Sequence, residues 1–141
     1  MEQDIECLQL TFHYIHYLGG YPLANARNSQ YGTLLVSEDK ISFWDTNKNE
    51  SIFEISIQQI KNCTLETKES LTGGKIILFR VFSCALRKNK QYIRIEFINE
   101  WSEFNNIVFY SPIDPSEPII QAINENRINF FKNLRYESGA F

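Results

Sequence analysis

Residues 116–134 read SEPIIQAINENRINFFKNL, and this stretch decides the fold. Its large apolar side chains recur at the helical period and fall within about a third of a helical wheel, the width of a stripe that faces a core. Ser116 suits the N-cap position, and Glu117 and Pro118 suit the first turn. The pattern predicts one amphipathic helix near the end of the chain. Its apolar stripe comprises Ile119, Ile120, Ile123, Phe130, Phe131 and Leu134.

The sequence before this helix alternates with a period of two, as half-buried strands do. In residues 51–57, Phe53, Ile55 and Ile57 share one face, while the residues between them are largely polar. Residues 91–98 repeat the pattern. Both segments are therefore predicted to be strands with one face on a core.

Shorter segments extend the series. Strands are predicted at residues 32–37, 40–45, 61–67 and 105–111, the last forming a hairpin with residues 91–98. A first strand is expected within residues 8–18, where Leu8, Leu10, Phe12 and Tyr14 alternate. Two segments leave alternatives open. Residues 4–10 suit a strand or a short helix, and residues 75–90 suit an eighth strand or a short helix.

Seven short strands followed by one amphipathic helix predict a mainly β domain. Closing a sheet on itself removes most of its unpaired edges, and an apolar helix can then fill the open end. We therefore expect a seven-stranded, partly open antiparallel barrel capped by the C-terminal helix. No repeat or linker divides the 141 residues, so we expect a single domain over residues 1–141 with its core at about residues 8–135.

Composition narrows the class of protein. The hydrophobic fraction is 43% and the formal net charge is -3, which suits a globular chain and disfavours nucleic acid as a partner. Cys7, Cys63 and Cys84 show no C-x-x-C spacing, which argues against a disulfide framework or a zinc site. The chain opens with acidic residues instead of a signal peptide, and its longest apolar-rich stretch, residues 76–86, is too short to span a bilayer. We expect a soluble, cytoplasmic protein.

Several ordered motifs resemble the PH-like domain superfamily, of the GRAM and bacterial PH type. The resembling segments are YLGGYP at residues 17–22, GTLLV at 32–36 with ISF at 41–43, FEISIQQI at 53–60, and residues 78–90, 92–97 and 106–110. The resemblance implies a scaffold that binds phosphoinositides, proteins or peptides without intrinsic catalysis or a cofactor. It covers nearly the whole chain.

The distribution of charge favours a protein partner within that resemblance. The lipid-binding form of the family keeps several cations in and after its first loop, whereas residues 19–31 hold only Arg27. We expect a binding module for protein–protein contact or self-association as a homo-oligomer. The alternative is a peripheral domain in weak contact with an anionic membrane. The candidate ligand- or lipid-binding residues are Tyr21, Arg27, Tyr31, Lys48, Arg87, Lys88 and Lys90.

Other chemistry-bearing residues favour structural roles. His13 and His16 are three apart, which on a regular strand places them on opposite faces and prevents them from sharing a metal ion. Cys63 and Cys84 lie in apolar contexts that predict core packing. Arg127 falls in the middle of the helical stripe, where its head is expected to reach water or pair with a carboxylate, with an anion site as the alternative. No catalytic or metal-binding residue is predicted.

Overall fold

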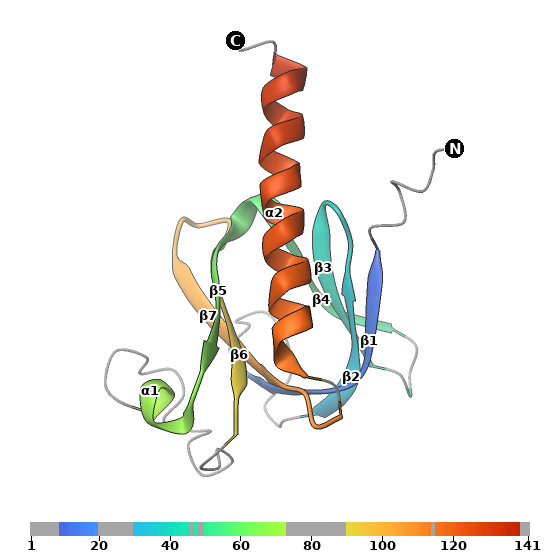
Figure 1. The fold of residues 1–141 in the computed structure, drawn as a ribbon, viewed down its shortest axis with the longest axis vertical. Coiled ribbons are helices and arrows are strands. Elements are labelled where there is room, and N and C mark those ends of the chain that lie inside the picture. Colours follow the sequence, from blue (N-terminus) through green and yellow to red (C-terminus); the bar gives the residue numbers. More distant parts are fainter. Residues whose placement is uncertain are drawn as a thin grey trace.

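The computed structural model describes residues 9–19, 30–45, 47, 50–72, 90–113 and 115–138. They form one antiparallel sheet and a long C-terminal helix that runs up the open side of the curled sheet (Figure 1). The strands are β1 (Leu10–Gly19), β2 (Gln30–Val36), β3 (Lys40–Asp45), β4 (Glu50–Ser56), β5 (Ile60–Glu66), β6 (Tyr92–Ile98) and β7 (Phe104–Tyr110). The helices are η2 (Ile57–Gln59), α1 (Lys68–Thr72) and α2 (Ser116–Ser138). The predicted fold class, seven strands with a C-terminal helix, is confirmed.

The sheet has the order β4-β3-β2-β1-β7-β6-β5. Strands β4 and β5 follow one another in the chain, yet they are the two edge strands of the sheet. The short helix η2 forms the corner that connects them. Gln59 holds this corner, because its side chain accepts from the Ser56 backbone N–H at 3.0 Å and donates to the Ile98 carbonyl at 3.0 Å. The corner thus fixes the start of β5 against the end of β6.

The core lies between the concave face of the sheet and the first half of α2. Four rings from β1, β3, β4 and β7 meet at its centre, with the centroids of Tyr17 and Phe53 5.2 Å apart. Ile119 and Ile123 of α2 are fully buried against this cluster. The predicted apolar stripe therefore caps the sheet, as expected.

The stripe does not stay buried along the whole helix. Phe131 is 45% exposed, and α2 continues past the end of the sheet in Figure 1. A 23-residue helix is longer than the concave face that it covers. Phe130 still packs against the core, whereas Phe131 lies beyond it. The prediction that Phe131 faces the core is wrong.

Strand β1 departs from simple alternation. The predicted apolar row holds at Phe12, which packs against the core, and fails at Tyr14, which is 52% exposed. The pairing with β2 shifts between Phe12 and Ile15, and Tyr14 has a left-handed backbone with φ of 59°. This β-bulge inserts one extra residue, so the inward row resumes at Ile15 and Tyr17.

A second, smaller apolar cluster lies on the convex face. Leu71 of α1 is fully buried there against Leu18, Tyr92 and Val108. This contact holds α1 against the sheet.

Of the two segments whose structure the sequence left open, residues 4–10 are described only at 9–10, where Leu10 begins β1. Residues 75–90 lie outside the described residues except for Lys90.

Candidate functional site

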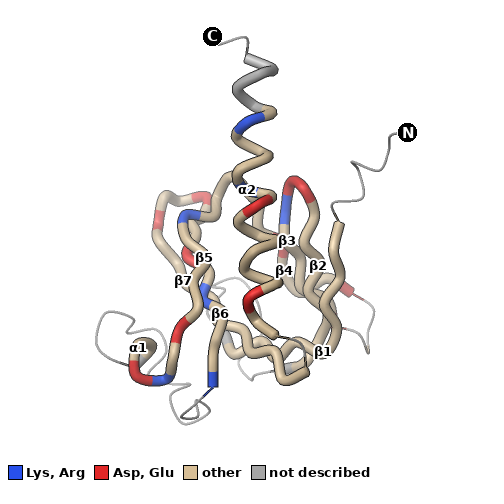
Figure 2. The backbone as a smooth tube through the Cα atoms, in the orientation of Figure 1, with Lys and Arg blue, Asp and Glu red and all other residues tan. Residues whose placement is uncertain are grey.

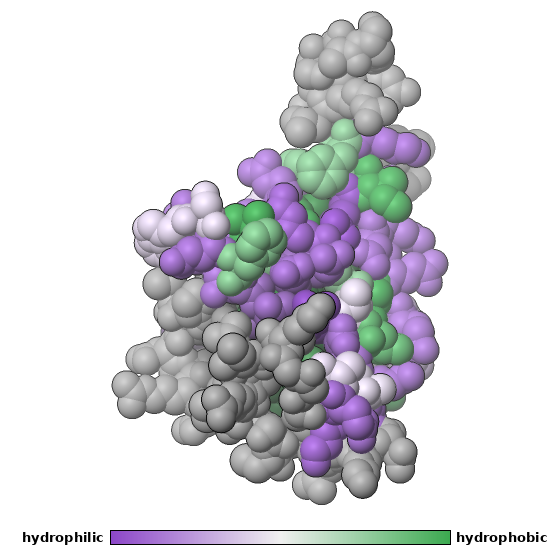
Figure 3. Space-filling view, turned by 90° about the vertical axis from the view of Figure 1, so that its left-hand side faces the viewer, coloured by the Kyte–Doolittle hydropathy of each residue, from purple (hydrophilic) through white to green (hydrophobic). Residues whose placement is uncertain are grey.

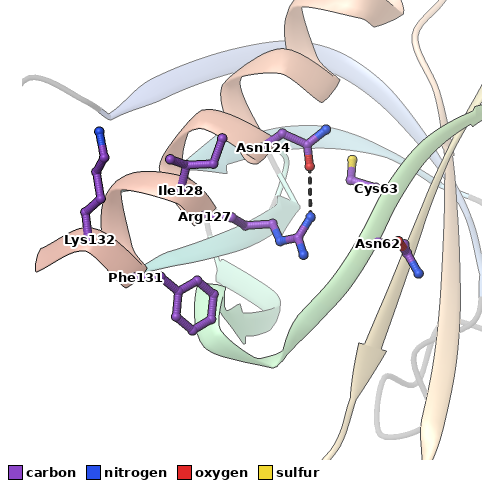
Figure 4. Close-up of a pocket in the computed structure, with 7 residues that line it drawn as sticks. All are labelled: Asn62, Cys63, Asn124, Arg127, Ile128, Phe131 and Lys132. Carbon is purple, nitrogen blue, oxygen red and sulfur yellow. Dashed lines mark hydrogen bonds between the residues drawn. The ribbon is translucent and has the colours of Figure 1, made fainter. Parts of the chain in front are cut away.

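A groove runs between α2 and β5, the strand at one end of the sheet (Figure 4). It is an open cavity of about 610 Å³. Its lining residues come from the two elements alone: Asn62, Cys63, Asn124, Arg127, Ile128, Phe131 and Lys132. In the part of the chain that the structure describes, no strand pairs with β5 on the side away from β6. The groove therefore adjoins an unpaired strand edge.

Apolar and basic side chains share the lining. Ile128 and Phe131 are 59% and 45% exposed, so the helix side of the groove presents two large apolar side chains to solvent. In Figure 3 apolar side chains gather where α2 leaves the sheet, with hydrophilic surface around them. Arg127 and Lys132 supply two cations, and no carboxylate belongs to the lining residues. The groove thus offers apolar contact together with net positive charge.

Arg127 crosses the groove from α2 toward β5, as Figure 4 shows. Its Nη2 donates to the backbone carbonyl of Lys61 at 2.8 Å, and its Nη1 donates to Oδ1 of Asn124 at 3.1 Å. Its Nε is buried and has no hydrogen-bond partner in the part of the chain that the structure describes. Among the described residues the partners of Arg127 are uncharged oxygens, whereas its head was expected from the sequence to reach water or pair with a carboxylate. The positive charge of Arg127 is therefore hydrogen-bonded but not neutralised.

Cys63 forms part of the groove wall but is unsuited to nucleophilic chemistry. Burial raises the pKa of its thiol to about 12, although the nearby charges of Arg127 and Arg94 act in the opposite direction. A thiol with this pKa carries almost no thiolate near neutral pH. Cys63 is free and buried, so its predicted packing role is confirmed.

A row of rings lies on the convex face across β2, β1 and β7. The Tyr31 ring stacks on Tyr14 with centroids 4.7 Å apart and on His16 with centroids 4.3 Å apart. His16 also pairs with Tyr110 of β7, and the Lys90 ammonium lies 5.9 Å from the Tyr110 ring centroid. Two predicted site residues, Tyr31 and Lys90, therefore lie along one row, while neither belongs to the groove.

The prediction that His13 and His16 lie on opposite faces of the strand is wrong. His13 contacts the Thr33 hydroxyl at 3.5 Å, and His16 stacks on Tyr31, so both side chains lie over the convex face of β2. The bulge at Tyr14 adds one residue between them and cancels the parity rule for a regular strand. Among the described residues no group of three or more His, Cys, Asp or Glu side chains is arranged to hold a metal ion.

The remaining predicted site residues are Tyr21, Arg27, Lys48, Arg87 and Lys88, and they lie outside the described residues. Sequence reasoning missed the groove residues Asn62, Asn124, Ile128 and Lys132. Arg127 was the one groove residue that gave a signal, as a cation inside an apolar stripe.

Basic and acidic residues are interspersed along the described backbone in Figure 2. Within the described residues no helix combines the length and the apolar character needed to span a membrane.

The fold defined by this sheet and helix is the PH/PTB-like fold. The chain is similar in structure to the C-terminal phosphotyrosine interaction domain of APBB2 from mouse, with a TM-score of 0.53 at 10% sequence identity. The match covers 84% of this chain and 87% of that domain. No family model matches the sequence, and no curated protein matches it. At this identity the likeness establishes the fold and leaves the ligand to be argued from the groove.

Proposed function

We propose that this protein is a non-catalytic binding module whose groove between α2 and β5 receives an extended peptide segment of a protein partner. Within the described residues the edge of β5 beside that groove pairs with no further strand, and this observation carries the proposal. An extended peptide can add to a sheet edge as a further strand, with its backbone bonded to the strand and its side chains in adjacent pockets. The fold of a phosphotyrosine interaction domain is consistent with this mode.

The groove meets the physical requirements of strand addition. The backbone edge of β5 supplies hydrogen bonds that any sequence can make, and these alone carry no specificity. Ile128 and Phe131 supply exposed apolar surface for alternate side chains of the peptide. Each large apolar side chain that becomes buried stabilises the complex by about 1.5–3 kcal/mol before the cost of ordering the peptide. A peptide would need about seven residues to pair along the whole seven-residue strand, because the two strands rise by nearly the same distance per residue.

The finer predictions from the sequence remain proposals. The GRAM or bacterial PH type rests on short strand motifs. Membrane contact rests on a basic set of which only Lys90 is described, with its ammonium over the Tyr110 ring. Self-association would use the same strand edge with a second copy of this chain as the added strand.

A peptide library tests the proposal directly. A random linear library is selected on the purified chain, and the affinities of the selected peptides are measured for the wild type, Ile128→Glu and Ile113→Glu. Both isoleucines are exposed, at 59% and 69%, and Ile128 alone lines the groove, so Ile113→Glu is the matched control. We expect Ile128→Glu to weaken binding by about tenfold or more and Ile113→Glu to leave it unchanged.

The same preparation separates the alternatives. Failure to select any peptide, or equal weakening by both substitutions, would contradict the proposal. Salt-sensitive sedimentation with vesicles of anionic lipid would favour the membrane alternative. A dimer in light scattering that Ile128→Glu converts to monomer would identify a second copy as the occupant of the groove.

A further inference from the structure

One edge carbonyl of β5 accepts a hydrogen bond from α2. The pairing of β5 with β6 shifts between Ile60 and Asn62, which leaves Lys61 as the extra residue of a bulge. The Lys61 carbonyl points toward α2, where it accepts from Arg127 Nη2 at 2.8 Å. A peptide strand that added along β5 would need this acceptor for its own backbone N–H. Arg127 therefore competes with the peptide for the start of the strand edge.

The guanidinium has hydrogen-bonding capacity left over. Arginine has five N–H donors in a planar fork, and Nη1 and Nη2 have two each. Among the described residues each of these nitrogens bonds to one uncharged oxygen, which leaves one N–H on each for a further acceptor. Lys132 adds a second positive charge to the lining of the same groove. An oxyanion would complement both the charge and the planar fork, because carboxylates and phosphates accept two parallel bonds from arginine.

We infer that the groove selects a peptide that carries an anionic group, and that Arg127 is the specificity-determining residue, exchanging its bond with the Lys61 carbonyl for a bond with that group. This inference rests on the proposed peptide-binding function and specifies the ligand class. When the anionic group accepts a hydrogen bond from Arg127, the Lys61 carbonyl loses its bond to Arg127. The carbonyl can then accept a hydrogen bond from a backbone N–H of the peptide. Recognition of charge and addition of the strand are thereby coupled.

A neutral peptide meets an unfavourable choice in the same groove. If the Arg127–Lys61 hydrogen bond stays intact, the peptide forms one backbone hydrogen bond fewer with the edge of β5. Otherwise it must displace Arg127 and leave a partly desolvated cation without a partner, which is costly. The groove thus discriminates against neutral sequences as well as favouring anionic ones.

The anion can come from two sources, the carboxylate of an aspartate or glutamate and the phosphate of a phosphorylated residue. The groove recognises the chemistry that they share. Three forms of one selected peptide separate them, with glutamate, glutamine or phosphotyrosine at the position that contacts Arg127. An alanine scan of the peptide against wild type and Arg127→Gln identifies that position.

The test measures the affinity of these three peptides for the wild type, Arg127→Gln, Arg127→Lys and Lys90→Gln. We expect the wild type to bind one or both anionic forms at least about tenfold more tightly than the glutamine form. Arg127→Gln should abolish the preference and bind the neutral form no more weakly than the wild type does. Arg127→Lys should keep part of the preference, because it keeps the charge and loses the fork. Lys90→Gln removes an exposed cation outside the groove lining and should behave as the wild type.

The outcomes distinguish this inference from the proposed function. If the wild type binds all three forms with equal affinity, the inference is wrong and the peptide-binding function stands. That comparison requires no variant and so does not depend on how a substitution folds. If the preference persists in a folded Arg127→Gln, Arg127 is not the specificity residue. If none of the peptides binds the wild type, the proposed function itself fails.

Discussion

Asn126 of α2 donates from Nδ2 to the carbonyl oxygen of Ser37 at 2.8 Å, across 89 residues of sequence. Asn126 is 5% exposed, and Ser37 lies between β2 and β3. The next residue, Arg127, bonds to Lys61 of β5. Successive residues of one helix are thus attached to two separate parts of the sheet. These two bonds add to the packing of Ile119 and Ile123 in holding α2 over the sheet.

Removing the amide of Asn126 should destabilise the protein. We expect Asn126→Ala to lower the free energy of unfolding by about 1–3 kcal/mol, because the part-buried Ser37 carbonyl loses its donor. Urea unfolding measures the change. Gln121→Ala is the control, because Gln121 is exposed and bonds only to Glu125 one turn along the same helix. Equal effects of the two substitutions would show that the long-range bond does not stabilise the fold.

Gly32 should tolerate no side chain. A Cβ at this position would lie 2.2 Å from the Trp44 carbonyl oxygen and 2.8 Å from Cζ of Phe43. Overpacking usually costs about 1–3 kcal/mol, and a backbone oxygen within a strand pair cannot move aside as a side chain can. We expect Gly32→Ala to lower the free energy of unfolding, measured in urea, by about 3 kcal/mol or more, and the control Ser51→Ala, at an exposed position of β4, to change it hardly at all. A cost for Gly32→Ala below about 0.5 kcal/mol would mean that β2 and β3 are spaced differently.

The stability of the protein should decline in mildly acidic solution because of His16. Burial lowers the pKa of this histidine from its ordinary value of 6.5, so the unfolded chain takes up the proton more readily than the folded one. This contribution is present in full above about pH 6.5 and is lost as the pH falls through the lowered pKa of the folded state. His16→Phe retains an aromatic ring that can stack on Tyr31 but removes the titratable group. The free energy of unfolding, measured in urea from about pH 5 to pH 7.5, should therefore vary less with pH in this variant than in the wild type.

His13→Phe is the matched control for this pH dependence. It replaces the exposed histidine of the same strand with the same ring, so the two variants differ in the position of the substitution and not in its chemistry. A slope that is unchanged in His16→Phe would assign the effect to other groups.

Cys63 should be almost unreactive toward alkylating reagents while the protein is folded. Burial raises the pKa of its thiol to about 12 from an ordinary 9.0, and alkylation proceeds through the thiolate. A chain with Cys7→Ser and Cys84→Ser isolates this thiol. We expect iodoacetamide to label it at least about a hundredfold more slowly in buffer than in urea at pH 8. Similar rates in the two solvents would place Cys63 outside the core.

The strands, their order in the chain and the C-terminal helix were predictable from periodicity. Alternation at Phe53 and Ile55 and the helical spacing of Ile119 and Ile123 report burial directly, and all four are buried. The β-bulge at Tyr14 was not predictable. It shifts the alternation of inward and outward residues by one position, and no particular residue type marks the place where this happens. Consequently the inward row of β1 after Phe12 was assigned to the wrong residues.

The groove was only partly predictable, because it depends on topology. Period-two alternation locates β5 but does not say that β4 and β5 lie at opposite ends of one sheet. The same helical stripe that marks Ile123 as core also includes Phe131, which lies beyond the core only because α2 outruns the sheet. Arg127 was visible in the sequence as an anomaly, and its role required the position of the Lys61 carbonyl.

The most direct test of the central claim is to locate a bound peptide by intermolecular NOEs, using a peptide selected on the wild-type chain. Strand addition in the groove predicts NOEs between the peptide backbone and β5 from Lys61 to Leu65, together with contacts from peptide side chains to Ile128 and Phe131. NOEs confined to the edge of β4, or to the stacked rings of Tyr14, His16 and Tyr31, would contradict it.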